Sequence, residues 1–307
     1  MRTSVFLSIL IPVYNWDIGE LLKKLSHQAE VVHDTYPIEI LAIDDGSDEF
    51  YNIESVENSL PLVKYESFSA NRGRVAVRND LIQRANGSYI LFLDADMLPD
   101  SDNFLQCYIE MAKSGNDIIC GGISYQQVTE IDEEYAFYLY KSKKTEAVSA
   151  SDRNQTPWRY LFTSNIMLRR EIVKEVMFDH RFSGYGFEDV EWAIRLAASY
   201  SIIHVDNSCT HMGLMKKKQV LSRMSDSIDN YALLLHLHPR ETAGSPASKA
   251  IKFLKILPDK ILHGADIVLE KLFFFFPWNF AAFVVFQCKK MVLLTIKIKN
   301  EKVSENT

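Results

Sequence analysis

Short apolar runs alternate with amphipathic segments over the first two hundred residues. The runs include SVFLSILIPV (4–13), IEILAID (38–44) and SYILFLD (88–94), and the segments between them carry apolar residues at helical spacing. A short apolar run without polar alternation is typical of a strand that is covered on both faces. The pattern therefore predicts an α/β fold, with a Rossmann-like, mostly parallel sheet flanked by helices.

The alternation continues to a helix that ends near Leu237. The chain has 307 residues, of which 47% are hydrophobic and 24% charged, which is typical of a folded domain with room for an appendage. Residues 126–160 are more polar and irregular, which predicts an insertion over one end of the sheet. Further strands are expected at 62–67, 117–124, 162–169 and 202–206, and helices at 16–33, 73–85, 101–115 and 187–199.

Charge and cysteine content narrow the class of protein. The formal net charge of -6 argues against a nucleic-acid-binding protein. The four cysteines are widely spaced, with no CxxC pair, which favours isolated thiols in a reducing compartment over a zinc site or a disulfide framework. The N-terminal apolar run is too short for a secretory signal, since Pro12 and Tyr14 follow directly. We therefore expect a cytoplasmic protein.

A change of composition divides the chain near residue 240. The segment HPRETAGSPASK (238–249) has the Gly, Pro and small polar residues of a linker. From Ser248 onward there are 10 Lys against 5 acidic residues, so this part carries +5 and the rest -11. We predict a catalytic or binding domain over 1–240 and a helical, apolar and basic appendage over 241–307.

The appendage contains the most apolar stretch of the chain. Residues 272–286 are interrupted only by Pro277 and Asn279, and lysines lie on both sides. Fifteen residues are short for a membrane-spanning helix. Basic residues beside an apolar segment with a tryptophan favour the surface of an anionic membrane, and we interpret the appendage as a peripheral anchor. A buried helix and a membrane span are the alternatives.

Acidic residues follow two of the expected strands. Asp45 is the second aspartate of the IDDGSD motif, which ends one strand, and Asp94 and Asp96 follow the strand ILFL in the LDADM motif. In a parallel sheet, ligands bind beyond the carboxyl ends of the strands. Asp94 and Asp96 lie two residues apart and so project to the same side of an extended chain, where two carboxylates can hold a divalent cation and a diphosphate. A helix-capping or loop pair is the alternative for a DxD taken alone.

No glycine-rich phosphate cradle is present, so metal and carboxylates are the remaining common solution for a diphosphate. Arg74 and Arg78 lie on one face of the expected helix after Asn71 and Gly73. Arg78 can reach a nucleotide while Asn71 shapes the entry turn. A solvated basic face is the alternative.

The segment FSGYGFEDVEWAIRL (182–196) is a second motif whose residues suggest a catalytic role. Two glycines permit a close-approach loop before Glu188 and Asp189, and a carboxylate presented there can act as a general base toward a hydroxyl. Acidic residues are also ordinary in a first helical turn, because the helix dipole stabilises them. His211, in CTHMG, is either a structural histidine or a metal ligand.

These motifs together resemble family 2 glycosyltransferases with a GT-A fold. The order SILIPVYN, IDDGSD, NRGRVAVRN, LDADM, GYGFEDVEW and a histidine carries the resemblance over residues 4 to 213. The segment FSGYGFEDVEWAIRL is similar to one shared by β-1,4-galactosyltransferases, polypeptide N-acetylgalactosaminyltransferases and chondroitin-polymerase domains. The galactosyltransferase segment usually has Trp where Tyr185 stands, so the donor sugar stays open.

The resemblance implies an inverting, metal-dependent transfer of a hexose or N-acetylhexosamine from a UDP-sugar to a glycan or lipid-linked glycan. It implies that Tyr14 packs on the base, that Asp45 accepts from the uracil ring, and that Arg78 and Asp94 lie at the nucleotide and donor sugar. It further implies donor contacts by Pro12, Asn71 and Ala95, binding of Mn²⁺ or Mg²⁺ by Asp96 and His211, catalysis by Asp189 as the base, and acceptor binding by Glu188.

Two rival functions stay open at this point. The first is transfer to a polyprenyl phosphate, whose acceptor oxygen is already ionised. The second is a binding module for nucleotide sugars or glycans without catalysis, although Asp96 and Asp189 are both present. The expected place of action is the cytoplasmic face of the cell membrane, in surface polysaccharide synthesis.

Overall fold

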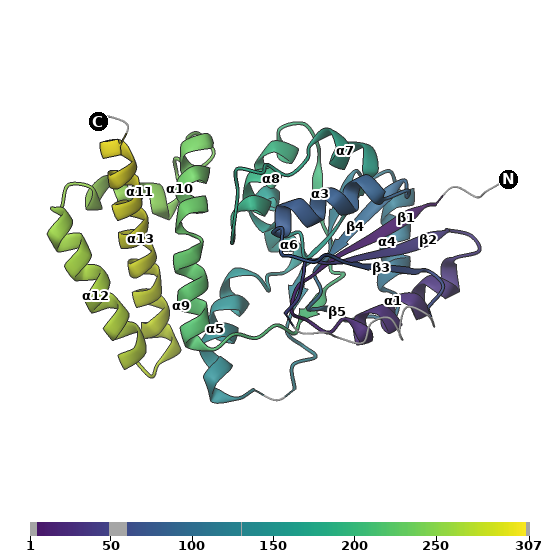
Figure 1. The fold of residues 1–307 in the computed structure, drawn as a ribbon, viewed down its shortest axis with the longest axis horizontal. Coiled ribbons are helices and arrows are strands. Elements are labelled where there is room, and N and C mark those ends of the chain that lie inside the picture. The colour runs from purple at the N-terminus through teal and green to yellow at the C-terminus, as the bar shows by residue number, and fades with distance from the viewer. Residues whose placement is uncertain (1–4, 49–59, 130, 305–307) are drawn as a thin grey trace. The chain divides into compact units, whose positions relative to one another are not determined.

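The computed structural model describes residues 5–48, 60–129 and 131–304, and the side chains up to Glu301 (Figure 1). Within it, the chain forms two compact units, each built from several segments. The first unit comprises 1–129, 143–181 and 192–213, and the second comprises 130–142, 182–191 and 214–307.

The first unit contains a seven-stranded sheet with the order β3-β2-β1-β4-β8-β6-β9. All neighbouring strands are parallel except β8, which runs antiparallel to both β4 and β6. This arrangement confirms the mostly parallel sheet predicted from the apolar runs. The strands are β1 (Leu7–Val13), β2 (Ile38–Asp44), β3 (Val63–Ser67), β4 (Tyr89–Leu93), β6 (Ile118–Cys120), β8 (Asn165–Arg169) and β9 (Ile202–His204).

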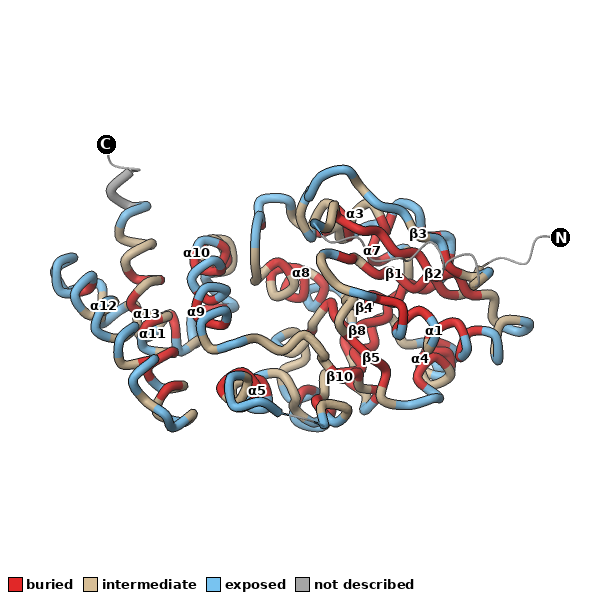
Figure 2. Tube along the Cα trace, turned by 60° about the horizontal axis from the view of Figure 1, so that its bottom comes forward, coloured by how far each residue is buried: buried red, intermediate tan, exposed pale blue. Residues whose placement is uncertain are grey.

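Helices cover both faces of this sheet, as Figure 1 shows. Successive strand residues face opposite sides, so Ile9 and Leu91 pack on one face while Leu10 and Phe92 pack on the other. The strands β1, β2, β4 and β8 are therefore apolar at most positions on both faces and are drawn as buried in Figure 2, whereas the edge strand β3 is partly exposed. The first face is covered by α1 (Gly19–Val32) and α4 (Phe104–Lys113), and the second by α3 (Arg74–Arg84), α7 (Arg170–Glu175) and the part of α8 (Glu188–Ala197) from Trp192 onward.

A second, three-stranded sheet of the first unit was not expected from the sequence. It has the order β5-β10-β7, from β5 (Met97–Pro99), β10 (Cys209–His211) and β7 (Ile123–Ser124). Strands of two or three residues are too short to show a periodic pattern. The antiparallel pairing of β10 with β5 sets His211 opposite Met97, next to Asp96. The small sheet therefore brings together two residues that are far apart in the sequence.

The second unit is helical, as predicted for the C-terminal part, and also holds part of the 126–160 insertion and the loop 182–191. The apolar run 272–286 is divided between two helices that lie side by side, α12 and α13, with Pro277 in the turn between them. In the described part of the chain, no helix is long and apolar enough to cross a membrane. The helices are α5 (Ala136–Thr145), α9 (Lys217–Asp226), α10 (Ile228–Leu237), α11 (Pro246–Leu254), α12 (Asp259–Phe275) and α13 (Asn279–Ser304).

The α12–α13 hairpin has a buried and an exposed side. Phe273 and Phe286 pack with Phe137 of α5 at ring distances of 4.9 and 5.8 Å, and Lys289 forms ion pairs with Asp266 and Glu270 across the hairpin. Much of α12 is exposed, as Figure 2 shows. The hairpin therefore contributes to the core of its own unit and also presents an apolar surface.

Candidate functional site

Three strands of the first unit end at the same edge of the sheet. The register of β1 and β2 pairs Val13 with Asp44, and β4 runs parallel to β1 on its other side. The residues after these strands therefore emerge at a common edge. This edge gathers the predicted donor-binding residues Pro12, Tyr14, Asp45, Asp94 and Ala95.

The loops after β1 and β2 are joined by hydrogen bonds. The backbone N–H of Asn15 donates to Ser47 Oγ at 2.7 Å, and the Asn15 side chain both donates to Asp48 Oδ2 (3.1 Å) and accepts from Asp48 N (2.8 Å). Asn15 tolerates its positive φ of 48° better than most residues. The neighbouring Tyr14 ring is 46% exposed, and its hydroxyl donates to Asp48 at 3.3 Å. An exposed, positioned aromatic ring suits stacking on a base.

Asp45 holds the turn that leads into α3. Its two carboxylate oxygens accept from the backbone N–H groups of Arg72 (2.7 Å) and Gly73 (2.8 Å). The backbone at Gly46 lies close to this turn, because a Cβ on Gly46 would be 2.8 Å from the backbone nitrogen of Asn71. The sequence predicts that Asp45 accepts from a uracil N–H, and the structure shows that it also accepts from these two backbone amides. Binding of the base by Asp45 and the exposed Asn71 stays a prediction.

Arg78 and Asp94 form a partly buried ion pair. Arg78 is 1% exposed, and its Nη2 donates to Asp94 Oδ1 at 3.0 Å. Phe178 lies 5.7 Å from the guanidinium carbon. A buried guanidinium needs a counter-charge, and Asp94 supplies one while a quarter of its own side chain stays exposed, at 28%. Arg78 therefore orients Asp94 at the edge of the sheet.

Asp96 and His211 meet directly. His211 Nε2 and Asp96 Oδ2 are 2.9 Å apart, and a Cβ on Gly213 would lie 2.2 Å from the same oxygen, so a larger residue there would displace the carboxylate. Burial would raise the pKa of Asp96, but the hydrogen bond and charge of His211 outweigh it and keep that pKa below its usual value. For His211, burial would lower the pKa, but the hydrogen bond and charge of Asp96 outweigh it and raise that pKa above its usual value. Each side chain of the pair therefore stabilises the charged form of the other.

The donor set of this pair fits a divalent cation. A carboxylate oxygen and an imidazole nitrogen are ordinary ligands of Mn²⁺. Over the described residues, no cluster of three or more His, Cys, Asp or Glu side chains could hold a metal ion. If Asp96 and His211 held a cation, the other coordination positions would be open to a phosphate and water, as is common for Mg²⁺.

Two further residues support this pair and were missed in the sequence. Tyr125 has its hydroxyl 3.4 Å from His211 Nδ1 and donates to Glu146 Oε2 at 3.1 Å. Asp100 accepts from hydroxyl groups of the strands β7 and β10, at 2.6 Å from Ser124 and 2.7 Å from Thr210. Asp100 thereby ties together the small sheet that carries His211. Neither residue belongs to a motif, so only their tertiary contacts reveal them.

A pocket of about 390 Å³ lies in the same unit. Its walls come from the segment after β6, including Tyr125, from residues 143–153 of the polar insertion, and from the segment after β9. Arg153, 2% exposed, forms part of the wall and donates to Val205 O at 2.9 Å. Burial, with the nearby Arg153, lowers the pKa of His204 to about 4. The other lining residues are Gly121–Ser124, Gln126, Lys143, Ala147–Ser149, Asp206 and Ser208.

Glu188 and Asp189 belong to the second unit. They open α8, and Asp189 Oδ1 accepts from the backbone N–H of Val190 at 2.8 Å. Glu188 is 6% exposed. The structure thus confirms a helix start at these carboxylates, as expected from the sequence. Their catalytic roles stay a prediction.

The fold and the sheet-edge site define an α/β protein that binds its ligand beyond the carboxyl ends of parallel strands. The sequence profile of the family described as Glycosyl transferase family 2 matches residues 8–177, and the chain belongs to this family. It is 26% identical over 234 residues to chondroitin synthase of Pasteurella multocida, covering 64% of this chain and 23% of that protein. The chain spans less than two thirds of the length of the curated relatives it matches first.

Solved structures share the fold at low sequence identity. The mannosyltransferase PcManGT of Pyrobaculum calidifontis, in complex with GDP-Man and Mn²⁺, has a TM-score of 0.57 at 14% identity, covering 97% of this chain and 88% of that one. Glucosyl-3-phosphoglycerate synthase of Mycobacterium tuberculosis, with Mn²⁺, UDP and glucosyl-3-phosphoglycerate, has a TM-score of 0.52 at 15% identity, covering 76% and 79%. The protein therefore has a GT-A fold.

Proposed function

We propose that the protein transfers a hexose or N-acetylhexosamine from a UDP-sugar to a hydroxyl of a glycan or glycolipid, with inversion and with bound Mn²⁺ or Mg²⁺. The observation that carries this proposal is the contact of Asp96, in the segment directly after β4, with His211 of β10, whose side chains are 2.9 Å apart. Two neighbours of the same fold contain Mn²⁺ with a nucleotide, which supports the metal. The chondroitin synthase relative supports a role in surface polysaccharide synthesis.

On the donor side, each side chain has a separate task. Tyr14 stacks on the base, and Asp45 holds the 72–73 backbone that borders it. Arg78 keeps Asp94 oriented toward the ribose and the donor sugar. Asp96 and His211 would hold the cation, which supplies neutralisation of the charge on the leaving diphosphate. Pro12, Asn71 and Ala95 complete the proposed donor contacts.

On the acceptor side, Asp189 is the proposed catalytic base. A hydroxyl is a poor nucleophile at neutral pH, so a base must take its proton as the new bond forms. Inversion requires the hydroxyl oxygen to bond to the anomeric carbon on the face opposite the diphosphate, while the bond to the diphosphate breaks. Asp189 accepts the proton, and Glu188 binds the acceptor hydroxyls.

Slow donor hydrolysis tests this function without knowledge of the acceptor. The purified protein is incubated with UDP-glucose, UDP-galactose, UDP-N-acetylglucosamine, UDP-N-acetylgalactosamine, UDP-glucuronic acid and GDP-mannose, with Mn²⁺ or with EDTA. We expect release of UDP from one or two donors, and only with the cation. Equal hydrolysis in EDTA would contradict the metal, and preference for GDP-mannose would contradict the base assignment.

Two alternatives are separated by related measurements. A polyprenyl-phosphate acceptor is already ionised, so transfer to it would not depend on Asp189. A binding module without catalysis would bind a UDP-sugar and leave it intact during long incubation. The acidic residues of the FSGYGFEDVEW segment are retained, which favours the transferase.

We further propose that the protein acts at the cytoplasmic face of the membrane, and that the α12–α13 hairpin contacts an anionic surface. At the turn of the hairpin, Phe275, Trp278 and Phe280 are 76%, 69% and 67% exposed. Lys217 donates to Phe276 O at 3.0 Å, so the basic segment 216–218 lies beside this apolar turn. Basic and apolar groups together suit anionic lipids.

Flotation with liposomes tests the membrane contact. We expect the full chain to float with vesicles in which about a third of the lipid is phosphatidylglycerol. It should float less at high salt, because salt screens the charge of the lysines. Absence from the floating fraction with both anionic and neutral vesicles would contradict a membrane surface.

A further inference from the structure

The loop that precedes Glu188 and Asp189 has an unusual backbone. Gly184 and Gly186 have φ values of +78° and +86°, and Phe187 has +68°. A glycine adopts such values at little cost, but a bulky residue does so only when surrounding contacts impose it. The conformation of Phe187, directly before the two carboxylates, therefore needs support from outside the loop.

Helix α10 of the same unit supplies the first part of that support. The side chain of Asn230 donates to Ser183 O at 3.0 Å and to Gly186 O at 2.8 Å. The ring of Tyr231 stacks on Phe187, with a centroid distance of 4.1 Å and an interplanar angle of 13°. Two neighbouring residues of one helix thus fix both the backbone and the aromatic ring of the loop.

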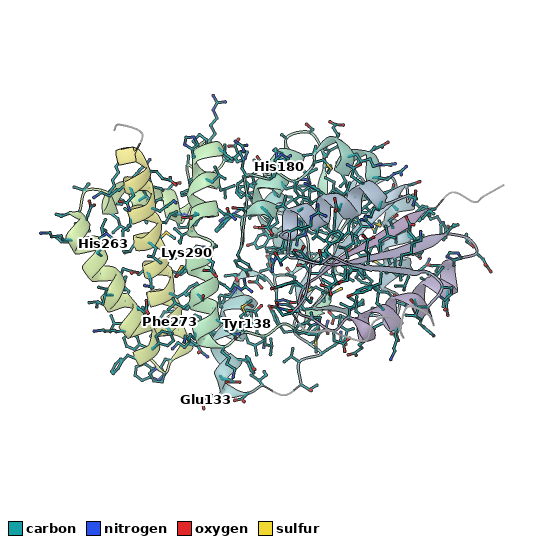
Figure 3. The ribbon with its side chains drawn as sticks, viewed as in Figure 1. Glu133, Tyr138, His180, His263, Phe273 and Lys290 are labelled. Atoms are coloured by element: carbon teal, nitrogen blue, oxygen red, sulfur yellow. The ribbon has the colours of Figure 1, made fainter. Side chains whose placement is uncertain are left out.

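Helix α13 supplies the second part through Lys290, which Figure 3 labels. The ammonium nitrogen of Lys290 lies 5.0 Å from the centre of the Phe187 ring and 4.8 Å from that of Tyr231. A cation over two stacked rings is attracted to both, and the attraction grows when the cation is shielded from water. Lys290 is half-buried. Burial, and to a smaller extent the charge of the nearby Lys141, lowers its pKa to about 8, so Lys290 stays charged at neutral pH.

We propose that Lys290 is a positioning residue: its ammonium group clamps Phe187 against Tyr231 and thereby sets the conformation of the turn that presents Glu188 and Asp189. The C-terminal helix is then part of the catalytic apparatus as well as a membrane contact. The catalytic consequence rests on the proposed function of Asp189, whereas the clamp itself rests only on contacts within the second unit.

The test compares Lys290→Met, which keeps the apolar stem and removes the charge, with Lys290→Arg, which keeps a cation able to stack on rings. We expect Lys290→Met to lower kcat for transfer, or for donor hydrolysis, by about tenfold or more. The Kd for UDP with Mn²⁺ should change less than twofold. Lys290→Arg should restore at least half of kcat. The matched control is Lys299→Met, which removes a lysine of the same helix that pairs with Asp259.

Hydrogen exchange of residues 182–191 tests the clamp independently of activity. We expect faster exchange there in Lys290→Met than in the wild type and in Lys299→Met. Unchanged exchange, an unchanged kcat, or a parallel loss of kcat and UDP affinity would each overturn the proposal. If the wild type neither hydrolyses nor transfers sugar while exchange responds as expected, the clamp stands and the proposed function fails.

Discussion

At the scale of single side chains, the Asp96–His211 pair links the site to its chemistry. Replacing Asp96 with Ala removes a proposed metal ligand and leaves His211 without the carboxylate that it contacts. We expect UDP affinity in Mn²⁺ to fall by about tenfold or more, to the value in EDTA. His211→Ala should give a smaller loss. Calorimetry with and without Mn²⁺ measures both, and an undiminished Mn²⁺ effect in Asp96→Ala would contradict the assignment.

Gly213 offers a test that no motif suggests. A methyl group at this position would lie 2.2 Å from Asp96 Oδ2, so the carboxylate must move. We expect Gly213→Ala to weaken Mn²⁺-dependent UDP binding by about tenfold, because a shifted ligand loses its geometry. The matched control is Gly244→Ala, where a Cβ meets no atom within 4 Å. Equal binding by both variants would show that Asp96 tolerates the shift.

Asp189→Asn keeps the size of the side chain and removes its basicity. We expect transfer to fall by on the order of 10²-fold, while UDP affinity stays within about twofold. Asp102→Asn, at an exposed position, is the control. Transfer near the normal rate would make Glu188 the first candidate for the base, and loss of UDP binding would show that Asp189 only stabilises the helix start.

At the scale of secondary-structure elements, the turn between α12 and α13 is the proposed membrane contact. Trp278→Ser and Phe275→Ser remove the two most exposed aromatic side chains of that turn. We expect the double variant to lose most of its flotation with anionic vesicles, because less apolar surface enters the interface. Its UDP affinity should not change. Phe253→Ser, equally exposed on α11, is the control, and loss of flotation there alone would move the contact away from the turn.

The same elements show why short segments escape a sequence-based prediction. The helices α1, α3, α4 and α8 and the strands β1 to β4 were expected within a few residues, since their apolar periodicity is local. The helix α5 was not expected, because it lies in the polar insertion at 126–160. The strands β5, β7 and β10 have two or three residues each and exist only because they pair with one another. The apolar run 272–286 was expected as one segment, but the turn at Pro277 divides it.

At the scale of the whole molecule, truncation after Pro246 separates the two proposed tasks of the chain. It removes α11, α12 and α13, including Lys290, and leaves all three segments of the first unit. We expect the truncated protein to bind UDP with Mn²⁺ and to lose most of its transfer activity, because the clamp on Phe187 is absent. Failure to fold would show that the appendage belongs to the core, and full activity would contradict its catalytic role.

The sequence by itself determined the architecture and the residues that gather at one edge of the sheet. Strand runs with apolar residues on both faces require a sheet that is covered on both sides, and parallel strands bring their carboxyl ends to one edge. The placement of Tyr14, Asp45 and Asp94 at that edge follows from these local patterns. The family followed from the same motifs, because their order along the chain is specific.

Only the tertiary structure decided how the individual side chains are used. In the folded chain, Asp45 accepts from two backbone amides, Arg78 donates to Asp94, and the ammonium group of Lys290 lies over the ring of Phe187. Each of these contacts joins residues that no sequence period relates, and each depends on which partner lies within a few ångströms after folding. Hydrophobic periodicity is a property of neighbours along the chain, whereas the choice of partner for a charge or a ring is a property of the packed fold.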